Sequence, residues 1–110
     1  MVRESKTVVT SRFYEVHLIE ILEYGIETFG YAQAKAYFNS ISHHVDMLGV
    51  FYTYYPECRH LATKSRMYRN IILDSHLIIY RITDKQIEVL DIIHSASNVS
   101  KIRNVRKTRL

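Results

Sequence analysis

The chain has 110 residues, of which 47% are hydrophobic and 24% are charged, and its formal net charge is +4. This length suits one domain with a single core, and the composition is ordinary for a globular protein. No apolar stretch reaches the length of a membrane span, the N-terminus lacks a signal-peptide core, and a single cysteine, Cys58, excludes an internal disulfide. We therefore expect one domain, residues 1–110, in the reducing cytoplasm and away from membranes.

The charges are distributed unevenly along the chain. Residues 1–58 contain four Lys or Arg and seven Asp or Glu, whereas residues 59–110 contain eleven against four, a net charge of +7. This asymmetry predicts that the second half meets a polyanion or an acidic protein. The alternative is a solvated basic surface without a partner.

The first half of the chain contains one strand pattern and two helix patterns. Residues 6–11 predict a short strand, and Thr10 or Ser11 is placed to cap the helix that follows. Apolar residues spaced three and four apart predict helices over residues 12–29 and 31–48. Because the link between them is so short, the two helices should form an antiparallel hairpin that needs a further surface to cover its apolar stripes.

Residues 68–94 form the most regular stretch, with the sequence YRNIILDSHLIIYRITDKQIEVLDIIH. Turn residues interrupt its apolar positions at 74–75 and at 83–85, which predicts three antiparallel strands. Both faces of the last two strands are largely apolar, so these strands should be covered on both sides. We therefore predict an α+β fold of order β-α-α-β-β-β, in which the helical hairpin packs on an antiparallel sheet.

The register of the strands determines which polar side chains share a face. With a two-residue second turn, Arg81 lies opposite Glu88 and shares a face with His94. The place of Arg69 stays open, because a two-residue first turn puts it away from Arg81 and a three-residue turn puts it beside Arg81. After the last strand, residues 99–110 combine apolar positions every three residues with many cations, which predicts a short basic helix or tail.

No nucleotide-binding or serine-hydrolase motif is present, and no Cys or His pair has metal-ligand spacing, so neither a metal nor a cofactor is expected. Cleavage of RNA requires activation of a 2′-hydroxyl, stabilisation of a phosphorane and protonation of a leaving oxygen. Arginine suits the second task and histidine the first or third. The candidate catalytic residues are therefore His94, Arg81 and Arg69. The candidate nucleic-acid-binding residues are Lys64, Arg66, Lys101, Arg103 and Arg106. The alternatives are a cross-strand ion pair of Arg81 with Glu88 and a backbone hydrogen bond for His94.

Taken in this order, the features resemble the RelE/ParE superfamily of type II toxin–antitoxin toxins. The resemblance covers about residues 6–98. It is strongest over residues 68–94, which look like the family's basic strand, its "iiYr" strand and its final strand ending in histidine. It implies a compact α+β toxin and a cognate acidic antitoxin that wraps it.

Two activities occur within this superfamily. RelE-like members cut mRNA on the ribosome with basic residues and a Tyr or His, whereas ParE-like members lack that site and poison DNA gyrase. Arg69, Arg81 and His94 occupy positions similar to functional ones in some ribonuclease members. The resemblance therefore implies a metal-independent mRNA endonuclease, with a gyrase poison or an inactive antitoxin-binding module as the alternatives.

Overall fold

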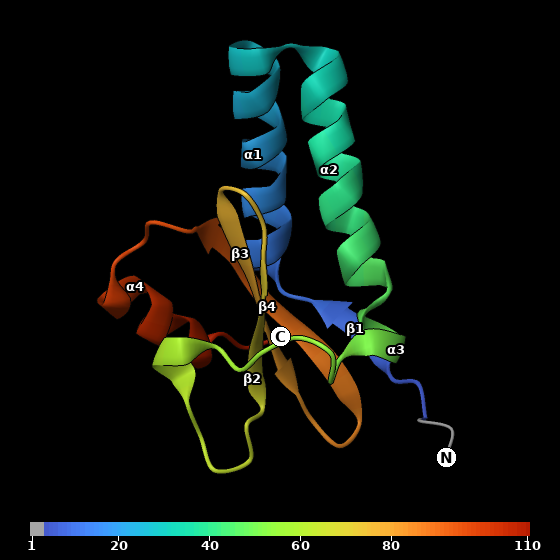
Figure 1. Ribbon diagram of the computed structural model, residues 1–110, viewed down its shortest axis with the longest axis vertical. Coiled ribbons are helices and arrows are strands. Elements are labelled where there is room, and N and C mark those ends of the chain that lie inside the picture. Colours follow the sequence, from blue (N-terminus) through green and yellow to red (C-terminus); the bar gives the residue numbers. More distant parts are fainter. Residues whose placement is uncertain (1–3) are drawn as a thin grey trace.

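The computed structural model describes residues 4–110, and its helices and strands follow the predicted order (Figure 1). The main elements along the chain are β1 (Thr7–Thr10), α1 (Arg12–Phe29), α2 (Tyr31–Asp46), α3 (Leu48–Phe51), β2 (Tyr68–Ile72), β3 (His76–Ile82), β4 (Gln86–His94) and α4 (Val99–Asn104). Two single 3-10 turns complete them, η1 (Arg59–Leu61) and η2 (Val105–Lys107). The α+β class, the helical hairpin of α1 and α2, and the short basic C-terminal helix are confirmed.

Local capping sets the limits of the helical hairpin. The Ser11 hydroxyl accepts the Tyr14 N–H at 3.0 Å and donates to the Leu90 carbonyl at 2.6 Å, so the same side chain caps α1 and ties it to β4. Gly30 separates the two helices at φ 91°, a conformation that favours glycine. The bounds predicted for α1 are confirmed, whereas α2 ends at Asp46 and α3 follows it.

The four strands form one sheet in the order β1-β4-β3-β2. The pairs β2–β3 and β3–β4 are antiparallel, as predicted, but β1 pairs with β4 in parallel, so the sheet is mixed. Arg69 pairs with Tyr80. The first turn therefore has two residues, and Arg69 lies on the face away from Arg81.

A β-bulge in β4 moves its C-terminal half to a different register. The pairs from Ile82 to Tyr80 are those predicted, but Ile79 pairs with Asp91, because β4 contains one extra residue there. An extra residue turns every later side chain to the opposite face. The prediction that Arg81 and His94 share a face is therefore wrong.

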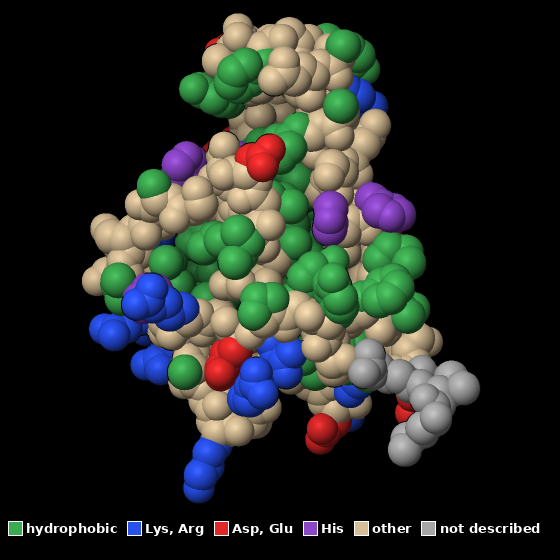
Figure 2. All heavy atoms as spheres, in the orientation of Figure 1, with side chains coloured by type: hydrophobic (Ala, Val, Ile, Leu, Met, Phe, Trp, Pro, Cys, Tyr) green, Lys and Arg blue, Asp and Glu red, His purple; other side chains and the backbone are tan. Residues whose placement is uncertain are grey.

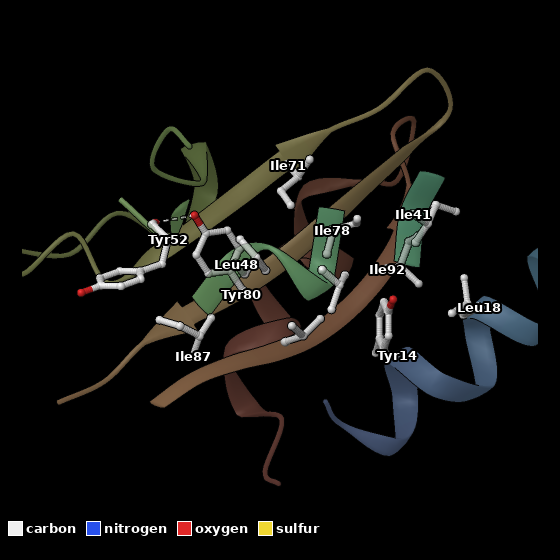
Figure 3. Packing of buried hydrophobic residues seen from close by; sticks show 12 residues of the cluster. Tyr14, Leu18, Ile41, Leu48, Tyr52, Ile71, Ile78, Tyr80, Ile87 and Ile92 are labelled. Carbon is white, nitrogen blue, oxygen red and sulfur yellow. Dashed lines mark hydrogen bonds between the residues drawn. The ribbon is translucent and has the colours of Figure 1, made fainter. Parts of the chain in front are cut away.

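Helices cover both faces of the sheet, as the apolar pattern predicted. The helical hairpin and α3 bury one face, where Tyr14, Leu18 and Ile41 pack toward the sheet residues Ile78 and Ile92 (Figure 3). The C-terminal segment and η1 bury the other face through a smaller cluster that contains Cys58, Leu61, Ile79, Leu90, Ile93, Ile102 and Val105. The turn between α1 and α2 extends beyond the sheet (Figure 1). Within residues 4–110, no helix is long and apolar enough to cross a bilayer.

Candidate functional site

Arg69 holds a loop against the sheet through its guanidinium group. Its Nε donates to the carbonyl of Arg66 at 2.9 Å, and one terminal nitrogen donates to the carbonyls of Tyr55 at 2.9 Å and Thr53 at 3.3 Å. These bonds join β2 to the irregular segment that precedes it. Three of the donors of Arg69 are thus directed at the protein's own backbone.

Arg81 lies on the opposite face of the sheet, toward the C-terminal segment. Two of its nitrogens approach Oε1 of Glu88 at 2.6 and 2.7 Å, and the side chains are only 16% and 15% exposed. Its terminal nitrogens also donate to the carbonyls of Arg106 and Thr108, both at 3.3 Å. The interpretation of Arg81 as a cross-strand ion pair is confirmed, and the same side chain fixes the end of the chain.

The electrostatics of this pair agree with its geometry. Burial favours the neutral form of each partner. In Arg81 the hydrogen bonds with Tyr68 and Glu88 outweigh burial, so its pKa is raised. In Glu88 the hydrogen bonds from Gln86 and Arg81 do the same, so its pKa is lowered. Both groups are therefore charged at neutral pH, and Arg81 contributes little net positive charge to the surface.

His94 lies at the exposed end of β4, on the side of the helical hairpin. Its Nδ1 accepts the N–H of Ala96 at 3.0 Å, and its ring centroid is 5.6 Å from that of His76. The Nδ1 of His76 shares a hydrogen bond of 2.8 Å with the hydroxyl of Tyr37, on α2. Burial lowers the pKa of His76, and the nearby His94 lowers it further.

A third histidine, His17 of α1, lies on this side of the sheet. The buried Asp91 of β4 approaches α1, where its Oδ1 accepts a hydrogen bond from Nδ1 of His17 at 2.6 Å. His17, His76 and His94 all line one groove of about 890 Å³ between the helical hairpin and the end of the sheet. We refer to it as the histidine groove. The sequence prediction missed His17 and Asp91, since no local pattern reveals a contact between residues 74 positions apart.

The histidine groove combines polar and apolar walls. Ile21, Phe29 and Ala34 line it together with the three histidines and Lys101. Each histidine ring is held through Nδ1. Within residues 4–110, no group of three or more His, Cys, Asp or Glu side chains is arranged to hold a metal ion. The groove therefore presents apolar side chains and imidazole rings next to one another.

Large apolar side chains remain exposed on the helical hairpin beside this groove. Tyr24, Phe29 and Tyr31 near its far end are 65%, 59% and 64% exposed, and Phe13 on α1 is 56% exposed. Hydrophobic side chains gather at this end in the space-filling view (Figure 2). So many exposed aromatic rings on one projecting element are typical of a surface that a partner covers.

The five candidate nucleic-acid-binding residues are all exposed, but the structure divides them. Lys101 lines the histidine groove. Lys64 and Arg66 belong to the loop after η1, and Arg66 lies 3.7 Å from Glu57. Arg103 and Arg106 belong to α4 and η2, which pack near η1. The five residues therefore do not form a single site with Arg69, Arg81 and His94. Those three residues are themselves apart: Arg69 and Arg81 lie on opposite faces of the sheet, and His94 lies in the histidine groove.

Comparison with known proteins agrees with this fold. A family model described as "ParE toxin of type II toxin-antitoxin system, parDE" matches residues 8–99. No curated protein sequence matches the chain significantly. Among solved structures, a chain from the chromosomal ParDE toxin–antitoxin system of P. aeruginosa is similar, with a TM-score of 0.68 at 16% identity. The match covers 84% of this chain and 98% of that one, and it supports the fold.

Proposed function

This chain belongs to the ParE toxin family of type II toxin–antitoxin systems, and from that membership we propose that it arrests growth by poisoning DNA gyrase. One observation carries the choice against mRNA cleavage. Arg69 and Arg81 point to opposite faces of the sheet, and each directs its donors at internal carbonyls or at Glu88. Neither guanidinium is available beside His94 to stabilise a phosphorane. This proposal replaces the expectation of a RelE-like ribonuclease.

Family membership implies an antitoxin partner. We place an amphipathic antitoxin segment along the histidine groove and the exposed aromatic side chains of the helical hairpin. The large exposed area of Tyr24, Phe29 and Tyr31 supports this placement, because an antitoxin that covers them removes apolar surface from water. In this proposal the toxin acts in the cytoplasm, where the antitoxin and gyrase are found.

Pulse labelling of induced cells tests the choice of target. Cells that express the toxin without its antitoxin receive labelled thymidine, uridine or methionine at short intervals after induction. A gyrase poison should reduce thymidine incorporation first and induce the DNA-damage response while translation continues. Loss of methionine incorporation before thymidine would instead support mRNA cleavage.

The variant His94→Ala is a useful second arm of that experiment. His94 is exposed and its ring accepts a local hydrogen bond, from the N–H of Ala96, so the fold should tolerate the change. Gyrase poisoning does not use His94 for proton transfer, so the variant should still arrest growth. Complete loss of growth arrest in a folded His94→Ala protein contradicts the proposal.

A further inference from the structure

The second half of the chain carries a concentrated set of free cations. Residues 59–67 and 95–110 contain eight Lys or Arg and no Asp or Glu. Seven of them are exposed and make no side-chain hydrogen bond or ion pair within residues 4–110. Of these seven, Lys101 lines the histidine groove. We call the other six the basic face: Arg59, Lys64, Arg103, Arg106, Lys107 and Arg109. Figure 2 shows Lys and Arg mostly in the lower half of the molecule, where α4, η1 and the loop after η1 lie in Figure 1.

The two segments of the basic face are held together by a buried cluster. Leu61 of η1 packs with Ile102 of α4 and Val105 of η2, and all three are buried. A fixed set of cations loses less conformational freedom on meeting a polyanion than a disordered tail does. The basic side chains therefore project from a folded surface.

Arg81 adds a second restraint on the same segment. It donates to the backbone carbonyls of Arg106 and Thr108, and Glu88 neutralises its charge. Arg81 thus holds in place the cations on either side of these carbonyls, while its own charge is paired with Glu88. Arg81 is a positioning residue for the basic face.

The helical hairpin has the opposite charge balance. Residues 12–46 contain two Lys or Arg and five Asp or Glu. Because the hairpin extends beyond the sheet (Figure 1), the molecule has a basic end and an acidic end. Such a charge distribution orients a protein in the field of a polyanion and directs the basic end toward it.

We propose that the basic face binds the phosphate backbone of duplex DNA. The inference rests on the proposed function, and it adds the DNA that gyrase holds to the target of the toxin. The six cations are Lys and Arg side chains, which bind phosphate oxygens, and such contacts carry no sequence information. Binding is therefore independent of sequence and sensitive to salt.

Fluorescence anisotropy of the full-length toxin with a short labelled DNA duplex tests the proposal. If most of the six cations each meet one phosphate, log K should fall against log salt with a slope of about −4 to −5, at about 0.9 per contact. The double substitution Arg103→Glu with Lys107→Glu should reduce the magnitude of that slope by about two and weaken binding at least about tenfold near 0.1 M salt.

A matched control separates an effect of the basic face on DNA binding from an effect of the net charge alone. The pair Arg12→Glu with Lys35→Glu changes the net charge by the same amount, and both of its sites are exposed on the helical hairpin. This control should bind duplex DNA like the unmodified toxin. Thermal unfolding verifies that both variants are folded before binding is measured.

Three results would overturn the inference: no salt-dependent binding to the duplex, equal losses in the two double variants, or a clear preference for single-stranded RNA of the same length. A gyrase supercoiling assay on the same proteins keeps the two proposals apart. Duplex binding that depends on the basic face, without any effect on gyrase, supports the inference and removes the gyrase target. Gyrase inhibition without duplex binding would support the gyrase target and overturn the inference about the basic face.

Discussion

Replacing Arg81 with alanine should destabilise the protein, because Glu88 then keeps its charge in a largely buried position without its main partner. The two side chains are 16% and 15% exposed, and their closest approach is 2.6 Å. The substitution also removes the donors to the carbonyls of Arg106 and Thr108. Removing one member of a buried ion pair costs about 3–5 kcal/mol. Gln86 still donates to Glu88 at 2.8 Å, so we expect a loss near the lower end, about 3 kcal/mol.

Urea denaturation measures this loss as a shift of the unfolding midpoint. The double variant Arg81→Met with Glu88→Leu should recover most of the stability, because it removes both charges from the buried site. Arg66→Ala serves as the control. Arg66 is 63% exposed and lies 3.7 Å from Glu57, so its loss should cost less than about 1 kcal/mol. An Arg81→Ala protein that unfolds like the wild type but no longer arrests growth would refute the structural role and restore Arg81 as a candidate catalytic residue.

Three further predictions concern the core and the histidine groove. Gly49→Ala should lower the unfolding midpoint, by about 1–3 kcal/mol in free energy, because the new Cβ would lie 2.5 Å from the carbonyl oxygen of Lys6; an unchanged midpoint contradicts this packing. Tyr80→Phe should lower the free energy of unfolding in urea by about 1 kcal/mol, since it removes a buried hydrogen bond of 2.6 Å to the carbonyl of Tyr52 (Figure 3). A more stable Tyr80→Phe protein would contradict this role of the hydroxyl. The pKa of His76 is lowered in the folded protein, so the unfolded chain binds the proton more readily. Stability should therefore fall as the pH drops below about 6.5 toward the folded-state pKa, and His76→Gln should flatten that part of the profile; an unchanged profile in the variant counts against the assignment.

Local signals predicted much of the fold. The spacing of apolar residues gave the limits of α1, and the sequence identified Ser11 as one of two possible caps. Turn residues separated β2, β3 and β4 correctly. These features depend on residues a few positions apart, so they can be recognised without knowledge of the tertiary structure.

The site could not be predicted in the same way. Arg81 and His94 were expected on one face, but the single extra residue in β4 places them on opposite faces. Beside the bulge, Asp91 bonds to His17 of α1 at 2.6 Å, a contact between residues far apart in the sequence. The histidine groove likewise brings together residues from α1, α2, β4 and α4. A register error of one residue was therefore enough to place Arg81 and His94 on one face in the prediction.

Gyrase poisoning is tested most directly with purified gyrase, plasmid DNA and the toxin, with translating ribosomes and mRNA in a parallel reaction. We expect the toxin to inhibit supercoiling or to trap cleaved DNA, and ribosome-bound mRNA to stay intact. Cleaved mRNA together with unaffected gyrase would contradict it.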